Sequence, residues 1–247
     1  MAGETIKTEA ICLAIHPWSQ TSHVVSWLTP AGRVVTVVKG AVRPKSAFLG
    51  QYDLNYTCEI TYYARARGDV HPLRECAPLR FREGLRDDFR SLALAGHFRR
   101  LSEELAPDGP DARAWFERLE SALDRLAGLA DAPPDRRARI RLVELLGFEG
   151  DALSFAGLAP DYSGFDPAAE WSPFSIERGA FDDGGGRILR IPAAVARCLR
   201  RPEDEKNTQI LLDAARVIGV FYQFHLDSPP ESRRAVLGIL QENEPGR

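Results

Sequence analysis

The sequence has no long apolar stretch. Its 247 residues contain no run approaching the roughly 18 consecutive apolar residues that a membrane-spanning helix requires. The N-terminal segment carries Glu4 and Glu9 and lacks the apolar core of a secretory signal. We therefore expect no membrane contact, and we predict a cytoplasmic protein.

Cysteine is scarce and scattered along the chain. No two of the four cysteines have C-x-x-C spacing, so they predict neither a zinc site nor a redox motif. Cys12 and Cys58 lie in apolar runs, and we interpret them as reduced core residues. We expect no metal site.

Catalytic motifs are absent as well. The sequence contains no G-x-S-x-G turn, no H-E-x-x-H pair and no G-x-x-x-x-G-K-[ST] phosphate loop. Asp182 and Asp183 precede three glycines, which is more typical of a polar turn than of a cation site. We predict that the protein is not an enzyme and uses no cofactor, and a hydrolase is the least favoured alternative.

The net charge of −3 is unevenly distributed. Residues 31–80 carry eight Lys or Arg against four Asp or Glu, which gives this segment a charge of +4 and the rest of the chain −7. A local basic face on an acidic protein is compatible with a nucleic-acid partner, because phosphate binding depends on the local field.

The first 80 residues have the pattern of β-strands. The best example is the segment 53–63, where Leu54, Tyr56 and Tyr62 belong to an apolar set that alternates with polar residues. Five short strands in so short a segment favour a closed barrel, because closure removes exposed strand edges. The expected strands are residues 9–16, 22–28, 33–39, 53–63 and 70–77.

The remainder has helical periodicity, interrupted by an irregular region at residues 148–190 that contains a possible hairpin of residues 174–177 with 179–181. Gly147 is expected to end one of the helices. The fold class predicted is α+β, with a barrel domain at residues 1–80 and a mainly helical domain at residues 81–247. The expected helices are residues 85–105, 111–129, 136–146, 192–200, 203–226 and 232–241.

A basic loop follows the apolar run of residues 34–38. Gly40 allows a sharp turn, after which Lys39, Arg43 and Lys45 could line the barrel wall and contact phosphates. The alternative is a solvated hairpin loop that is merely basic.

Aromatic residues accompany this charge. Stacking platforms beside a basic groove are typical of proteins that bind single-stranded nucleic acid. The alternation assigns Tyr56 and Tyr62 to the core, which leaves Trp18 and Tyr63 as the better candidates for exposure.

A row of arginines accompanies the apolar face of the segment 136–146. It includes Arg136 and Arg137, and it could hold an acidic peptide that ends in hydrophobic residues. An ordinary solvated amphipathic helix is the alternative.

Three ordered motifs resemble the RecO family of bacterial recombination mediators. The first is Trp18-Ser19-Gln20-Thr21-Ser22, followed by Thr29 and by Gly32-Arg33. The second is Val38-Lys39-Gly40-Ala41 with Arg43, Ser46 and Gly50 after it. The third is residues 222–226 (YQFHL) followed by Ser232-Arg233.

The resemblance implies an N-terminal OB-fold barrel and a helical domain. Members bind single- and double-stranded DNA, anneal complementary strands, and work with RecR to load RecA on DNA coated by single-strand binding protein (SSB). It further implies association with the nucleoid during repair. By position, Lys39, Arg43 and Lys45 would contact DNA, as would Arg33 and Arg65, and Arg136 and Arg137 would meet the acidic SSB tail.

The chain departs from the family where many members carry a zinc-finger-like insertion. After Leu145-Leu146-Gly147-Phe148 it has Ser154-Phe155-Ala156-Gly157 in place of a C-x-x-C pair. The insertion at residues 148–190 is therefore expected to be zinc-free, and either to keep the loop architecture without the metal or to be partly disordered. The main functional alternative is an interaction adapter whose barrel docks a protein and contacts DNA only incidentally, because OB folds host many functions.

Overall fold

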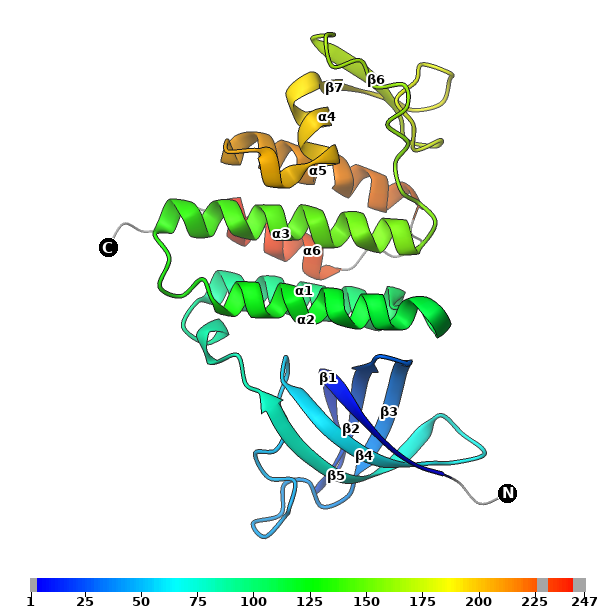
Figure 1. Ribbon diagram of the computed structural model, residues 1–247, viewed down its shortest axis with the longest axis vertical. Helices are drawn as coiled ribbons and strands as arrows, with labels where there is room; N and C mark the ends of the chain where they lie inside the picture. The colour runs from blue at the N-terminus through cyan, green and yellow to red at the C-terminus, as the bar shows by residue number, and fades with distance from the viewer. Residues whose placement is uncertain (1–3, 226–230, 242–247) are drawn as a thin grey trace. The chain divides into compact units, whose positions relative to one another are not determined.

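The computed structural model describes residues 4–225 and 231–241, and it divides the chain into two compact units, Met1–Ala130 and Asp131–Arg247. Figure 1 traces the order of the elements along the chain. Strands followed by helices make an α+β protein, and the predicted class is confirmed at this level.

The first unit begins with a five-stranded sheet. Strands β1–β2, β2–β3, β1–β4 and β4–β5 pair antiparallel, while β3 and β5 pair in parallel. The sheet closes on itself because β4 pairs back to β1, so every strand has two neighbours. The strands are β1 (Glu4–Ser19), β2 (Ser22–Thr29), β3 (Gly32–Val38), β4 (Thr57–Ala64) and β5 (Val70–Arg80).

The sheet encloses an apolar core. Trp27 is fully buried, and its indole Nε1 donates to Thr36 Oγ1 at 2.8 Å. Tyr56 and Tyr62 are buried, as the alternation predicts. The prediction for Leu54 is wrong: β4 begins only at Thr57 and Leu54 is 37% exposed. Asn55 interrupts the strand because its φ of 68° lies in the left-handed region.

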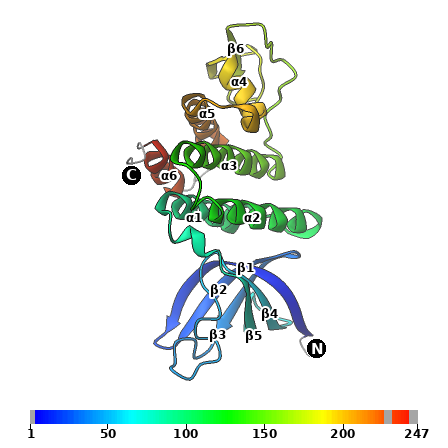
Figure 2. The same ribbon diagram turned by 60° about the vertical axis from the view of Figure 1, so that its left-hand side comes forward.

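Two helices complete the first unit, α1 (Phe89–Leu105) and α2 (Ala112–Ala127), with short 3-10 turns η1 (Glu83–Leu85) and η2 (Gly109–Asp111) before them. Both helices contact the strands, and Figure 2 shows α1 and α2 side by side. Arg82, only 8% exposed, donates from Nε to Asp124 Oδ1 of α2 at 2.6 Å. The last strand of the sheet ends at Arg80, but the compact unit also includes both helices and extends to Ala130.

The second unit is mainly helical. The prediction that a helix ends at Gly147 is wrong, because α3 continues through it to Phe155. A glycine inside a helix costs about 1 kcal/mol relative to alanine, and the burial of Phe148 and Leu153 beyond it offsets this cost. The elements are α3 (Pro134–Phe155), β6 (Trp171–Ser175), β7 (Ile188–Pro192), α4 (Ala193–Arg200), η3 (Pro202–Asp204), α5 (Thr208–His225) and α6 (Glu231–Gln241).

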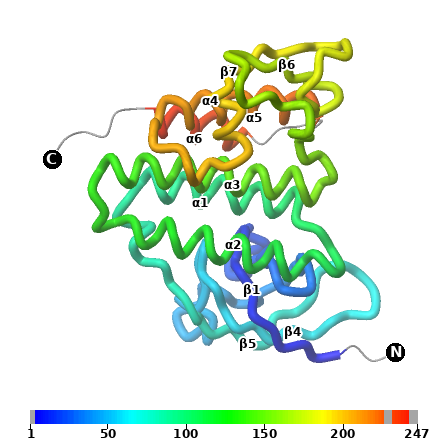
Figure 3. The backbone as a smooth tube through the Cα atoms, turned by 45° about the horizontal axis from the view of Figure 1, so that its top comes forward, coloured from blue at the N-terminus to red at the C-terminus, as the bar shows by residue number. Residues whose placement is uncertain are grey.

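The irregular region carries a two-stranded sheet, visible beside α4 in Figure 3. Its strands are β6 and β7. The predicted hairpin of residues 174–177 with 179–181 is confirmed in part, because Ser175 and Ala180 form an antiparallel bridge, but the main partner of β6 is β7. Phe181 packs against the rings of Tyr162, Phe165 and Phe174, with centroids 5.0–5.4 Å apart. Apolar packing thus holds this region.

A buried ion pair joins α6 to α3. Arg233 donates from Nε and Nη2 to the two carboxylate oxygens of Glu149, at 2.7 and 2.9 Å, and also to the carbonyl of Ala215. Tyr222 donates to the Glu149 carbonyl at 3.0 Å, and burial raises the pKa of its phenol. Leu226 of the third motif lies outside the described residues.

No helix within residues 4–225 and 231–241 is both long and apolar enough to cross a membrane. Within the same ranges, no group of three His, Cys, Asp or Glu side chains is placed to hold a metal ion.

Candidate functional site

The basic loop begins where β3 ends. Gly40 has a φ of 68°, a left-handed value that favours glycine, and the Arg43 amide donates back to the Gly40 carbonyl at 3.2 Å. The Arg43 side chain lies across this turn, because a Cβ on Gly40 would sit 3.3 Å from Arg43 Cδ. Lys39, Arg43 and Lys45 are all exposed.

A hollow of about 490 Å³ lies beside this loop, and we call it the Trp18 hollow. It joins the β1–β2 hairpin to the end of β3 and the basic loop. Its lining includes one aromatic ring and two cations but no acidic side chain. The lining residues are Trp18, Ser19, Thr21, Ser22, Val37, Lys39, Gly40 and Arg43.

Hydrogen bonds fix the two sides of the Trp18 hollow relative to each other. The Gly40 amide donates to Ser22 Oγ at 3.3 Å, and the Val42 amide donates to the Thr21 carbonyl at 3.4 Å. The cations of the hollow are therefore held near the hairpin before any ligand arrives. A hollow of this kind can bind an anionic ligand that also presents a flat ring.

The cations at this site are available for a ligand. Across the described part of the chain, Lys39, Arg43 and Lys45 form no ion pair. An exposed charge without a protein partner keeps its full attraction for an incoming anion, subject only to screening by salt.

Arg33 and Arg65 lie elsewhere. Arg33 is near the opposite end of β3 from Lys39, about 20 Å along the strand at its usual rise. Its Nη1 donates to the carbonyl of Glu103 in α1. Arg65 precedes β5, and its amide donates to Nδ1 of His71, which pairs with Thr36 near the middle of β3. The structure brings Lys39 and Arg43 together, but not Arg33 or Arg65.

The predicted arginine row occupies the start of α3. Arg136 is exposed, and Arg137 is half-buried and engaged with other residues. Arg139 donates to the carbonyls of Glu203 and Glu205, at 2.5 and 2.7 Å, and Arg141 is buried. Three of the four arginines are thus engaged by other residues of the chain, and only Arg136 is exposed.

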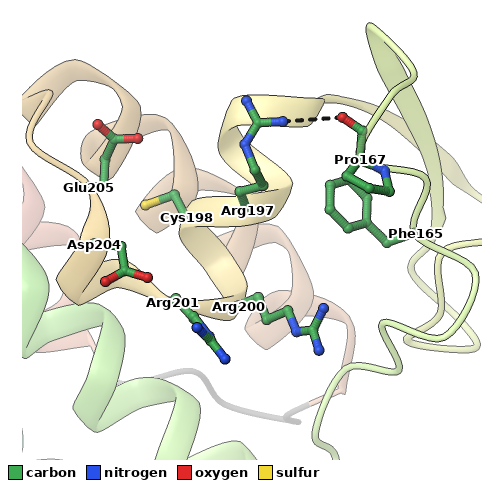
Figure 4. Close-up of a pocket in the computed structure, with 8 residues that line it drawn as sticks. All are labelled: Phe165, Pro167, Arg197, Cys198, Arg200, Arg201, Asp204 and Glu205. Atoms are coloured by element: carbon green, nitrogen blue, oxygen red, sulfur yellow. Dashed lines mark hydrogen bonds between the residues drawn. The ribbon is translucent and has the colours of Figure 1, made fainter.

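A second basic hollow, of about 440 Å³, lies in the second unit between α4 and the loop before β6 (Figure 4). Three arginines near the end of α4 line it, and the Arg197 guanidinium donates to the Pro167 carbonyl at 3.4 Å. Asp204 and Glu205 also line it, so its charge is mixed. Sequence analysis missed this hollow, although the run Arg197-Cys198-Leu199-Arg200-Arg201 was a visible signal.

Neither Cys198, in the second hollow, nor Cys12, in the core of the sheet, is suited to thiol chemistry. Burial raises the pKa of Cys198 to about 12 and also raises the pKa of Cys12 well above its ordinary value. Both thiols therefore stay protonated near neutral pH, and a protonated thiol is a poor nucleophile and metal ligand. Cys12 and Cys58 are buried and free of disulfides, which confirms their interpretation as reduced core residues.

A small closed sheet with a cationic hollow, followed by helices, is a frame suited to binding polyanions. The family model described as "Recombination protein O C terminal" (RecO_C) matches residues 86–234, more than half of the chain. The chain therefore belongs to the RecO family, and the resemblance found in its motifs is confirmed.

Three relatives carry the name DNA repair protein RecO. The protein from Geobacter metallireducens is 31% identical over 147 residues, which cover 59% of this chain and 59% of the relative. The protein from Roseiflexus is 28% identical, over 60% of this chain and 52% of the relative. The protein from Rhodopirellula baltica is 25% identical, over 73% of this chain and 64% of the relative. The chain thus covers less than two thirds of each relative's length.

One solved structure was also compared. An aspartyl tRNA synthetase from Entamoeba histolytica is 10% identical, and the match covers 98% of this chain and 56% of that one. The TM-score of this match is 0.26.

Proposed function

We propose that this chain is a DNA repair and recombination mediator that binds single- and double-stranded DNA. The observation that carries the proposal is the Trp18 hollow, where Lys39 and Arg43 converge beside an exposed aromatic ring with no acidic side chain in the lining. Lys45 is exposed in the same loop, outside the lining of the hollow. Phosphate oxygens are the natural partners of such cations.

The topology of the first unit supports an OB fold. Strand order β1-β2-β3-β5-β4 with a parallel β3–β5 pair is the arrangement of a five-stranded Greek-key barrel. OB folds bind oligonucleotides on the face of strands 2 and 3 and with the loop between strands 1 and 2. The Trp18 hollow involves that loop and the end of β3.

The mechanism we propose involves no covalent chemistry and no cofactor. Cations neutralise the phosphate backbone, which lowers the repulsion between two complementary strands and lets them anneal. As the family resemblance implies, the protein would work with RecR to load RecA on SSB-coated DNA. Arg136 and Arg137, at the start of α3, are the candidates for contact with the acidic SSB tail.

The test is a triple substitution, Lys39→Gln, Arg43→Gln and Lys45→Gln, in the full chain. Three lost phosphate contacts should lower the slope of log affinity against log salt by about 2 for single-stranded DNA and weaken binding roughly tenfold or more at low salt. The matched control replaces Arg197, Arg200 and Arg201 of the second hollow by Gln, removing the same charge. Equal losses in both variants, or a wild-type affinity independent of salt, would sink the proposal.

A second candidate function is a protein-interaction adapter, and a patch of the first unit favours it. Leu54, Phe81 and Leu92 line one hollow of this unit and are 37%, 45% and 38% exposed. Such patches mark interaction sites. An adapter would retain an SSB-tail peptide in a pull-down and fail to shift DNA, whereas the mediator would shift DNA.

A further inference from the structure

We propose that Trp18 is a base-stacking platform that makes the Trp18 hollow selective for unpaired nucleotides. The inference rests on the proposed function, since it assumes that DNA enters this hollow. It adds the residue that distinguishes a single strand from a duplex.

A β-bulge directs Trp18 away from the sheet. In the β1–β2 pairing, Pro17 lies opposite His23 and Ser19 lies opposite Ser22, so Trp18 is the extra residue on β1. A bulged residue is unpaired and its side chain is re-aimed, and bulges are common next to functional sites. Pro17 before it has no N–H with which to continue the ladder.

The Trp18 side chain is unusually exposed for a tryptophan. It is 71% exposed, whereas Trp27 and Trp115 are fully buried or nearly so. Within the described residues its ring stacks on no other ring, and no cation lies over its face. Trp171, the other exposed tryptophan, is covered by the Arg190 guanidinium 5.9 Å from its ring centre. Keeping so large an apolar surface in water is costly unless a ligand covers it.

The surroundings of Trp18 complete a site for one nucleotide unit. Lys39 and Arg43 line the same hollow, so a phosphate can meet cations while its base lies on the indole. The hydrogen bonds from Gly40 to Ser22 and from Val42 to Thr21 hold the hairpin and the loop together beforehand. Preorganisation of this kind lowers the entropy cost of binding.

Selectivity follows from what each form of DNA exposes. The faces of bases in a duplex are covered by their neighbours in the stack, so the indole can reach them only if a base is unstacked at a cost of a few kcal/mol. A single strand offers its base faces freely. The cations, in contrast, meet phosphates in both forms.

The first experiment compares Trp18→Ala with the wild type, using the full chain. Affinity is measured by fluorescence anisotropy for an oligothymidine of about 16 nucleotides, the upper end of an OB-fold site, and for a duplex of the same length. We expect single-strand affinity to fall about 5- to 100-fold, as the loss of one stacked base implies, and duplex affinity to change less than about twofold. Trp171→Ala, the matched control, should change neither.

The second experiment uses the conservative variant Trp18→Phe, which keeps a ring and should retain most of the single-strand affinity. Titration with oligothymidine should quench the tryptophan fluorescence of the wild type, and this quenching should be largely lost in Trp18→Phe. This fluorescence measurement compares only the wild type and Trp18→Phe, so it tests the stacking role even if Trp18→Ala folds poorly.

The outcomes separate the two proposals. A wild type that binds neither DNA overturns the proposed function. DNA binding that the basic-loop substitutions weaken, but that Trp18→Ala weakens equally for both forms or not at all, overturns the stacking role alone. Trp18→Ala that leaves DNA affinity intact and abolishes retention of the SSB-tail peptide would assign Trp18 to a protein interface instead.

Discussion

The cations beside Trp18 in the first unit and Arg233 in the second unit have opposite roles. In the first unit, Lys39 and Arg43 end in an exposed hollow without ion pairs among the described residues. In the second unit, Arg233 is 7% exposed and bound to both oxygens of Glu149, which is completely buried. One set is left open to a ligand, and the other anchors a helix.

The difference shows why charge in a sequence does not by itself mark a binding site. Arg233 and its partner Glu149 are 84 positions apart, so nothing near Arg233 in the sequence reveals the pair. The Arg139 guanidinium likewise donates to the carbonyls of Glu203 and Glu205, which are more than 60 positions away in the sequence. A cation is available for a partner only where the fold provides no acceptor.

The largest predicted effect is a loss of stability when Arg233 is replaced. The change Arg233→Met leaves the buried Glu149 carboxylate without the guanidinium that neutralises it. We expect the free energy of unfolding to fall by about 3–5 kcal/mol, measured by urea denaturation followed by circular dichroism. DNA affinity under folding conditions should be unchanged.

The control is Arg234→Met, at the exposed neighbouring position, which should cost less than about 0.5 kcal/mol. Adding Glu149→Leu to Arg233→Met should restore much of the loss, because the buried charge is then gone. A loss below about 1 kcal/mol in the single variant would show that the pair does not anchor α6.

A smaller effect is expected at the glycines of the basic loop. Gly40 and Gly50 both have left-handed φ values, 68° and 74°, but only a Cβ on Gly40 would meet another side chain, that of Arg43. Either substitution by Ala should cost about 1–2 kcal/mol of unfolding free energy through backbone strain. Only Gly40→Ala should also weaken DNA binding, because it displaces Arg43.

Thermal denaturation and anisotropy titrations of both variants check this prediction. Gly50→Ala is the control, because it introduces the same backbone strain but its Cβ would contact no other side chain. Equal DNA affinities for the two variants would mean that the position of Arg43 over Gly40 is unimportant for binding.

The smallest effect concerns the pH dependence of the second unit. Burial raises the pKa of Tyr162 from 10.0 to about 12, so the folded state holds the phenol proton more tightly than the unfolded chain does. The stabilisation is complete below pH 10 and declines as pH rises from about 10 to about 12. Tyr162→Phe should make the loss of stability in this range shallower.

Urea denaturation at a series of pH values above about 9 measures this slope. The Phe variant keeps the ring that stacks on Phe181, so packing is preserved while the titrating group is removed. An unchanged slope would assign the alkaline loss to other groups, of which Cys198 is the first candidate because its pKa is also raised to about 12.

Much of the fold followed from local patterns. Alternation placed Tyr56 and Tyr62 in the core, and helical periodicity placed the helices. The errors arose where tertiary contacts outweigh local signals. Gly147 does not end α3, because Phe148 and Leu153 are buried beyond it. Leu54 is exposed because Asn55 leaves the strand region of backbone space.

The candidate site was predictable only in part. The sequence indicated the basic loop and the exposure of Trp18, both of which depend on local composition. The bulge at Trp18, the hydrogen bond from Gly40 to Ser22 and the separation of Arg33 from Lys39 depend on strand register. Register is set by pairing between distant segments, which one sequence does not reveal.

The pairing that closes the sheet also has a consequence for synthesis of the chain. Strand β1 pairs along its first half with β4, and Glu4 lies opposite Ala64, about 60 residues later. At ordinary translation rates of about 5–20 residues per second, the first strand waits roughly 3–12 seconds for this partner to be made. During that interval its apolar residues have no permanent cover. The basic loop that separates β3 from β4 thus also lengthens the time before the first half of β1 can pair with β4.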